Sequence, residues 1–209
     1  MRTIKWTFIA VAAIGASLVC GLDAQATAPA KASTLDNLQY AYNGESNAKV
    51  RYEAFAAKAD LEGYKSVAGL FRATAKSESI HAAKHAAALK KLGAEAKATI
   101  EKPEVKSTKE NLEAALKGET EELTSMYPNF LKQALTEKNP TAARSFKGAL
   151  AGEVGHAKLF KQALAELDAW KAPGKEFLVC MVCGYTTMDK DLKKCPVCAA
   201  PRGKFEVVK

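Results

Sequence analysis

Two Glu-x-x-His pairs are the feature of the sequence that most restricts the possible fold of this chain. They are Glu78 with His81 and Glu153 with His156, and each lies in a segment whose apolar residues recur every three or four positions. That spacing predicts amphipathic helices, and residues three apart on a helix share one face. Each pair can therefore present a carboxylate and an imidazole to one interior point.

Two single glutamates complete the pattern. Glu45 and Glu119 lie on mainly apolar faces of two further helical segments. Four helices then supply four glutamates and two histidines, the ligand set of di-iron and di-manganese sites in four-helix bundles. Such ligands suit iron or manganese, and without cations the buried carboxylates would repel one another. Glu122, one turn beyond Glu119, is a candidate seventh ligand, whereas Glu121 should point elsewhere.

The residues between 34 and 171 are rich in alanine, lysine, glutamate and leucine, which favour helices. The signals for helix starts and stops are, in chain order, Ser33 or Thr34, a break at Gly63-Tyr64, a stop at Gly93, a capping box at Ser107–Glu110, a kink or interruption near Tyr127 caused by Pro128, a start at Asn139-Pro140 and an end at Pro173-Gly174. Residues 94–106 are long enough to cross a bundle. We expect a mainly α fold of four long helices with one long crossover, the last helix running through Leu167.

Two glycines flank Glu153 in the last of these helices. Gly152 and Gly155 each cost about 1 kcal/mol relative to alanine inside a helix. The helix is therefore expected to be either looser at this point or packed closely on a neighbour.

The last 35 residues contain four cysteines and too few apolar residues for a core of their own. Cys180-x-x-Cys183 and Cys195-x-x-Cys198 are separated by eleven residues, a spacing typical of a four-cysteine metal site. Zinc is one alternative to iron there, and two disulfides are another in an oxidising compartment.

The N-terminus has the organisation of a Sec-type signal peptide. Its parts are the basic residues Arg2 and Lys5, an apolar run over 6–19 and the small-residue motif Ala24-Gln25-Ala26. We expect cleavage after Ala26, a linker over 27–33, no membrane span after cleavage, and a periplasmic or otherwise exported protein. An uncleaved anchor and lipidation at Cys20 are the alternatives, and the apolar run is short for a bilayer span.

The net charge of +8 comes from lysines interleaved with glutamate and alanine. It forms no dense basic block, so we expect no nucleic-acid partner. Walker, Rossmann, Gly-x-Ser-x-Gly and His-Glu-x-x-His motifs are also missing from the sequence, which removes support for nucleotide-binding, hydrolase and metalloprotease functions.

Taken together, the motifs resemble rubrerythrin over nearly the whole chain after the signal. They are Asn43-Gly44-Glu45-Ser46 with Tyr52 and Phe55-Ala56, Glu78-Ser79-Ile80-His81-Ala82, Gly118-Glu119-Thr120-Glu121-Glu122 running to Met126-Tyr127-Pro128, Glu153-Val154-Gly155-His156, Cys183-Gly184-Tyr185, Cys195-Pro196-Val197-Cys198 and Phe205-Glu206. The resemblance implies a ferritin-like di-iron bundle over 34–171, followed by a rubredoxin-like domain over 175–209 that holds one iron in four thiolates.

The same resemblance implies roles for single residues. Iron ligands would be Glu45, Glu78, Glu119, Glu153 and His156, with Glu122 and His81 competing for one iron as its oxidation state changes. Tyr52 and Tyr127 match tyrosines that lie beside the ligands in this family. His85, one turn after His81, is expected to be an ordinary surface or core histidine.

The function implied is a peroxidase that reduces hydrogen peroxide to water, with the thiolate-bound iron delivering electrons one at a time. In the family, electrons pass between subunits of a head-to-tail dimer, so we expect a homodimer. An exported protein needs an exported electron donor, and we expect a periplasmic cytochrome or another small redox protein. The alternatives are a ferroxidase that handles iron and a non-enzymatic electron-transfer or redox-sensing protein.

Overall fold

The computed structural model describes residues 32–209. The predicted signal peptide, its cleavage after Ala26 and the alternative lipidation of Cys20 lie outside the described residues. So does most of the predicted linker. These statements about the N-terminus stay predictions.

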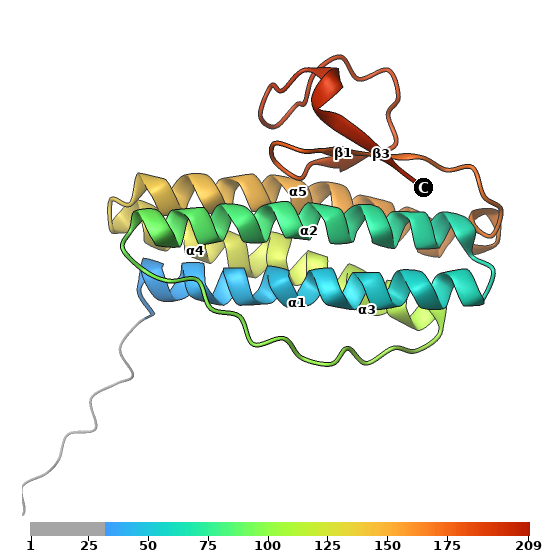
Figure 1. Ribbon diagram of the computed structural model, residues 1–209, viewed down its shortest axis with the longest axis horizontal. Coiled ribbons are helices and arrows are strands. Elements are labelled where there is room, and N and C mark those ends of the chain that lie inside the picture. The colour runs from blue at the N-terminus through green and yellow to red at the C-terminus, as the bar shows by residue number, and fades with distance from the viewer. Residues whose placement is uncertain (1–31) are drawn as a thin grey trace, which may run out of the picture. The chain divides into compact units, whose positions relative to one another are not determined.

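Five α-helices of residues 32–209 build the bundle, and Figure 1 shows their arrangement. Their bounds are α1 Thr34–Leu61, α2 Lys65–Lys91, α3 Thr108–Glu121, α4 Tyr127–Thr136 and α5 Pro140–Ala165. The helices α1 and α2 run antiparallel, whereas α3 and α4 follow one another along the same side and pack with α5. The predicted mainly α, ferritin-like architecture is confirmed.

The helix ends follow the local signals in the sequence. Ser33 caps α1 and Ser107 caps α3, in each case as a reciprocal capping box with the acidic residue three positions on. The side chain of Asn139 accepts from the backbone N–H of Ala142 at the start of α5. Gly93 follows α2 with φ of +80°, a conformation that glycine adopts without steric cost.

The third predicted helix is interrupted just before Tyr127, one of the two outcomes expected from Pro128, so two shorter helices stand in place of one long helix. A π-helical turn, Glu122–Met126, separates α3 from α4, and the N–H of Tyr127 donates to the carbonyl of Glu122 five residues back. Pro128 has no N–H to donate four residues back and its ring crowds that carbonyl, so a regular α-helix cannot continue through it. The interruption near Tyr127 was predictable from Pro128, whereas its π geometry was not.

The last helix is shorter than expected. Helix α5 ends at Ala165, and Leu167 begins a separate 3-10 turn, Leu167–Trp170. This turn places Trp170 in the core, where its ring lies 6.0 Å from that of Phe177 in the following strand. Burial of the large indole side chain provides a physical reason for ending the helix there.

The crossover between α2 and α3 runs along α1 (Figure 1), where side-chain amides of α1 bind its backbone. Asn43 accepts from the N–H of Thr99 at 2.8 Å, and Asn47 accepts from that of Glu101 at 2.8 Å. The Nδ2 of Asn47 also donates to the carbonyl of Thr99 at 2.9 Å. Asparagines four apart on one helix face thus satisfy alternate backbone groups of an extended segment.

Two apolar clusters occupy the two ends of the bundle. One contains Tyr52, Phe55, Phe71 and Phe160, and the other is built around Tyr127 with leucine, alanine and phenylalanine side chains. The predicted metal ligands lie between the clusters. Those of α1, α2 and α5 are on central turns, whereas Glu119 is in the last turn of α3 and Glu122 follows that helix.

The C-terminal residues form a small antiparallel sheet in the order β2-β1-β3. Its strands are β1 Phe177–Cys180, β2 Thr186–Thr187 and β3 Phe205–Val208. The tail packs on α2 and α5 of its own bundle, where Ser77 donates to the carbonyl of Gly184 at 2.6 Å and Arg72 to that of Lys209 at 2.7 Å.

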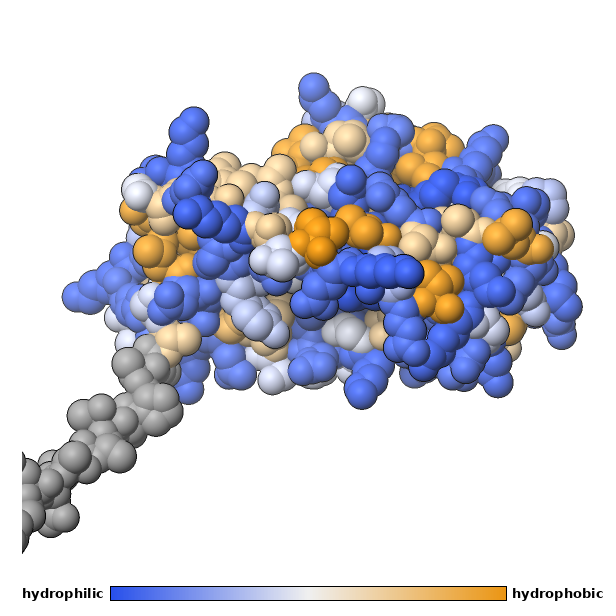
Figure 2. All heavy atoms as spheres, turned by 60° about the horizontal axis from the view of Figure 1, so that its bottom comes forward, coloured by the Kyte–Doolittle hydropathy of each residue, from blue (hydrophilic) through white to orange (hydrophobic). Residues whose placement is uncertain are grey.

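Hydrophilic side chains predominate on the face drawn in Figure 2, where apolar residues form small separate patches. Among residues 32–209, no helix has both the length and the apolar character needed to cross a bilayer.

Gly152 and Gly155, which flank Glu153 in α5, are explained by close packing on neighbouring segments rather than by a looser helix. A Cβ on Gly152 would lie 2.7 Å from Nε2 of His81, and one on Gly155 would lie 2.8 Å from the carbonyl oxygen of Thr186. Only a hydrogen in place of the side chain lets the tail and α2 approach α5 this closely.

We expect Gly155→Ala to loosen the tail, because the added methyl group meets the backbone of β2; the cost should be about 1–3 kcal/mol of unfolding free energy. The matched control is Gly148→Ala on the same helix, where a Cβ meets nothing within 4 Å. That change should stabilise by about 0.5–1 kcal/mol. Urea unfolding and limited proteolysis of residues 171–176 measure both effects, and equal stabilisation by the two variants would contradict the close contact.

Candidate metal centres

The predicted ligands from four helical segments converge in the middle of the bundle. Two groups of side chains each bring their ligand atoms within 4.8 Å of one another. The first is Glu45, Glu78, His81 and Glu153, and the second is Glu78, Glu119, Glu153 and His156. All six residues are buried, with at most 3% of any side chain exposed.

Glu78 and Glu153 belong to both groups, and each directs one oxygen to each half of the site. Glu78 places Oε2 at 2.9 Å from Nδ1 of His81 and Oε1 at 3.2 Å from Nδ1 of His156. Glu153 places Oε1 at 3.2 Å and Oε2 at 2.7 Å from the same two nitrogens. If two cations were bound, Glu78 and Glu153 could each hold both of them, and Glu45 and Glu119, the terminal carboxylates, would each hold one.

The acid-base properties of the cluster show what a cation must offset. Burial, together with repulsion from Glu78, raises the pKa of Glu119 to about 8 and that of Glu45 well above its usual range. Burial opposes charging of His81, but Glu153 and Glu78 outweigh it and raise the pKa of this imidazole to about 9. Two divalent cations would match the charge of four carboxylates and two neutral imidazoles.

Glu122 lies outside both groups, although sequence and resemblance place it among candidate ligands. It begins the π turn, is half-buried, and lines a hollow of 440 Å³ together with Asn47, Arg51 and Glu121. Burial and the charge of Glu153 raise the pKa of its carboxyl well above the usual range. In this structure His81 therefore belongs to a ligand group, whereas Glu122 lies in the hollow beside the site. Glu121 is exposed and belongs to neither ligand group.

Each predicted tyrosine donates a hydrogen bond to one terminal carboxylate. The hydroxyl of Tyr52 donates to Oε1 of Glu119, and that of Tyr127 donates to Oε1 of Glu45. Both tyrosines are almost completely buried. The two apolar clusters thus each direct one hydroxyl at one half of the site.

The C-terminal tail closes the site over His81. A Cβ on Gly184 would lie 2.7 Å from Oγ of Ser77 and would also overlap Nε2 of His81, and Gly184 has φ of +87°. Gly152 meets the same imidazole from α5. The sequence analysis did not single out Ser77, and it noted Gly184 only as part of the cysteine motif. A positive-φ glycine after the second cysteine was the available signal.

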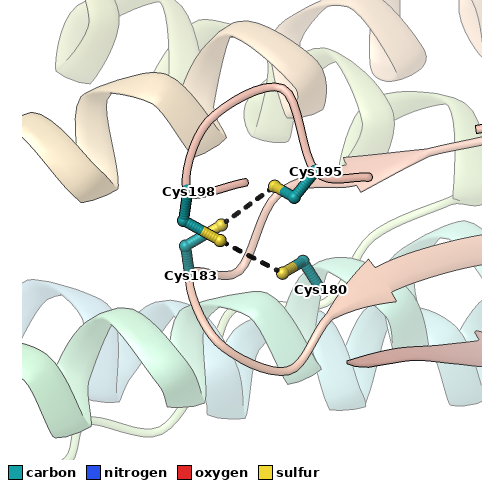
Figure 3. Close-up of side chains that lie close together, drawn as sticks. All are labelled: Cys180, Cys183, Cys195 and Cys198. Atoms are coloured by element: carbon teal, nitrogen blue, oxygen red, sulfur yellow. Dashed lines mark hydrogen bonds between the residues drawn. The ribbon is translucent and has the colours of Figure 1, made fainter. Parts of the chain in front are cut away.

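The four cysteines converge as Figure 3 shows. Sγ of Cys180 lies 3.7 Å from that of Cys198, and Sγ of Cys183 lies 3.5 Å from that of Cys195. A tetrahedral site with metal–sulfur bonds of about 2.3 Å places its sulfurs roughly 3.8 Å apart, whereas a disulfide requires about 2.05 Å. These four cysteines are free, so the disulfide alternative is wrong for this structure.

Both clusters fit metal ions on their own chemistry. In the bundle, Oε2 of Glu45 is buried with no hydrogen-bond partner among the described residues, a state that a bound cation relieves. In the tail, three of the four thiols are buried and all four sulfurs converge. Carboxylates with imidazoles and a set of four thiolates are two ligand sets that iron accepts.

Comparison with protein families agrees with both clusters. The family model described as Rubrerythrin matches residues 36–164, and the one described as Rubrerythrin, rubredoxin-like domain, matches residues 179–206. The chain belongs to the rubrerythrin family. It therefore has the di-iron site and the four-cysteine rubredoxin-like iron site of this family, and it is an iron-dependent oxidoreductase.

Relatives of known name support this membership. The chain is 37% identical over 175 residues to nigerythrin from Nitratidesulfovibrio vulgaris. This alignment covers 83% of this chain and 85% of nigerythrin. The chain is 37% identical over 179 residues to Rubrerythrin-2 from Clostridium acetobutylicum, which covers 84% and 96%. The fully reduced, all-ferrous structure of nigerythrin has a TM-score of 0.79 at 34% identity and covers 89% of this chain and 91% of its own. A bacterioferritin from Desulfovibrio desulfuricans, at 22% identity and a TM-score of 0.59, shares the fold.

Metal binding in the bundle should release protons, because the ligands bind deprotonated. With a pKa of about 9, His81 is protonated at pH 7 before metal binds, as is Glu119 with a pKa of about 8. Affinity for Mn²⁺ or Fe²⁺ should rise with pH up to about 9 and fall on acidification, by about tenfold per pH unit for each proton released. Calorimetry at pH 7 in two buffers of different ionisation enthalpy counts the protons.

Glu119→Gln should weaken metal binding by at least ~10-fold, since it removes a ligand rather than a supporting residue. Glu121→Gln is the matched control on the same helix, because that side chain is exposed. Metal uptake without proton release, or equal affinities in the two variants, would contradict this assignment of the site.

Proposed function

We propose that this rubrerythrin-family protein is a peroxidase that reduces hydrogen peroxide to water. The overall reaction takes two electrons and two protons per peroxide and yields two water molecules. When bound, a pair of ferrous ions supplies both electrons to the O–O bond at one place. The observation that carries the proposal is the placement of a four-cysteine site against a ligand of the di-iron site, through the contact of Gly184 with His81.

The residues around the site have distinct tasks in this proposal. Glu78 and Glu153 hold the two halves at a fixed separation, because each directs one oxygen to each half. The polar hollow lined by Asn47, Arg51 and Glu122 offers a route by which a small polar oxidant reaches the site. Tyr52 and Tyr127 donate hydrogen bonds to the terminal carboxylates and keep them oriented.

The exchange of Glu122 for His81 belongs to the same proposal. Glu122 is the first residue of the π turn, where the backbone departs from the regular α ladder. Such turns accommodate an altered helix register and are frequent at functional sites. A carboxylate that moves in from the hollow would add the negative charge that a more oxidised pair of irons requires.

The electron donor, assembly and location are further parts of the proposal. The predicted signal at residues 1–26 supports export, and an exported protein needs a donor such as a periplasmic cytochrome or another small redox protein. A homodimer follows from the family resemblance. Mass spectrometry of the N-terminus after fractionation tests export: a chain beginning at Thr27 in the periplasm is expected, and an uncleaved chain in the cytoplasm would contradict it.

Peroxide reduction is tested on the chain of residues 27–209, with metal content and visible spectra measured first. We expect about three irons per chain, two in the bundle and one in the tail, and a visible band that depends on the cysteines. One equivalent of peroxide should rapidly reoxidise the reduced protein.

Cys195→Ser is the control, since it removes one sulfur of the tail and leaves the bundle ligands in place. The variant should lose the visible band and slow in turnover with a donor, while its reduced bundle still reacts with peroxide. Inertness of the wild type to peroxide with rapid reaction with dioxygen would favour the ferroxidase alternative. Inertness to both would favour electron transfer or sensing.

A further inference from the structure

His85 lies on α2 one turn after His81 and belongs to neither metal group. It is fully buried, and both of its ring nitrogens have partners. Nδ1 lies 2.8 Å from Oγ of Ser145 on α5, and Nε2 lies 3.1 Å from the hydroxyl of Tyr127 on α4. The imidazole therefore connects two hydroxyl groups inside the bundle.

The directions of these hydrogen bonds follow from which groups can donate. The hydroxyl of Tyr127 has one proton and donates it to the carboxylate of Glu45, so it accepts from Nε2–H of His85. A neutral imidazole with a proton on Nε2 must accept at Nδ1, and Ser145 supplies that proton. All three bonds thus point toward Glu45.

The outer end of this series reaches the surface. Ser145 is 7% exposed and lines a hollow of 230 Å³ with Lys84, Lys91 and Arg144. Water in such a hollow can give a proton to the serine hydroxyl and be replenished from solvent. The inner end is a terminal carboxylate of the metal site.

The other tyrosine has no comparable connection. The ring of Tyr52 lies 5.9 Å from that of Phe71 and 5.6 Å from that of Phe160, and these side chains carry no transferable proton. Its polar neighbour, Arg51, does not release a proton at any physiological pH. Among residues 32–209, a series of hydrogen-bonded side chains that can pass a proton is therefore expected on the Glu45 side.

We infer that Ser145 and His85 form a proton relay from this surface hollow to Tyr127 and Glu45. The inference rests on the proposed peroxide reduction, which consumes two protons per turnover. In each transfer Tyr127 passes its hydroxyl proton toward Glu45 and takes the Nε2 proton of His85. Nδ1 then takes the proton of Ser145, which takes one from a hydronium ion in the hollow and leaves water there. Every relay residue ends neutral, and the proton that reaches Glu45 is consumed in forming the product water. Rotation of the imidazole ring restores the first tautomer.

The first test compares His85→Gln and Ser145→Ala with the wild type. A glutamine amide can donate to Tyr127 and accept from Ser145, but it does not pass a proton through itself. We expect each variant to keep its iron content and melting temperature and to lose about tenfold or more in the rate of peroxide reduction, with an altered solvent deuterium isotope effect. The matched control is Thr74→Val, since this buried hydroxyl on α2 bonds only to the carbonyl of Leu70 in its own helix.

A purely structural role for His85 predicts a wild-type rate in His85→Gln, and that result would overturn the relay. A wild-type rate in Ser145→Ala would overturn the assignment of its outer end. If the wild type itself does not react with peroxide, the proposed function fails.

The second test is independent of turnover. In the full chain loaded with diamagnetic zinc, long-range ¹H–¹⁵N spectra should show His85 protonated at Nε2 and bare at Nδ1. Protonation at Nδ1 would reverse the hydrogen bonds and overturn the relay whatever the activity.

Discussion

Four carboxylates meet in the interior of one helical bundle, and their mutual repulsion is the constraint on which the rest of the structure depends. Glu78 and Glu153 relieve it only in part, by directing their oxygens at two histidines. Burial still keeps the pKa of Glu45 and Glu119 high, so these carboxyls are protonated in the metal-free cluster and must lose their protons when cations bind. The apolar clusters at both ends of the bundle provide the stability that allows such a cluster in its middle, since burial of each large side chain contributes about 1.5–3 kcal/mol.

Close backbone approach is the second requirement of the site. Gly152 and Gly184 both approach the ring of His81 near Nε2, and Gly155 lets the small sheet pack on α5. The absence of a Cβ at these positions brings the four-cysteine tail directly against a ligand of the bundle. The cost of glycine in a helix, about 1 kcal/mol each, is therefore offset by contacts between segments far apart in the sequence.

The two halves of the bundle site resemble each other in their ligands and differ in their surroundings. Each has one terminal glutamate that accepts from a tyrosine hydroxyl. Beyond Tyr52 lie phenylalanine rings, whereas beyond Tyr127 lie His85 and Ser145. This difference assigns distinct roles to two carboxylates that the ligand pattern alone makes equivalent.

The sequence by itself determined the helical bundle, its ligands and the cysteine site, because each depends on spacing along one segment. Glu-x-x-His places two ligands on one helix face, and Cys-x-x-Cys makes a metal-binding turn, wherever the segment lies in space. The helix caps and the interruption at Pro128 are local in the same way. Tertiary structure alone decided that Glu122 stays outside the ligand groups while His81 is inside, because this depends on the π turn and on the tail. It also decided that His85 joins Ser145 to Tyr127, since that contact brings together three helices whose side-chain distances no local pattern specifies.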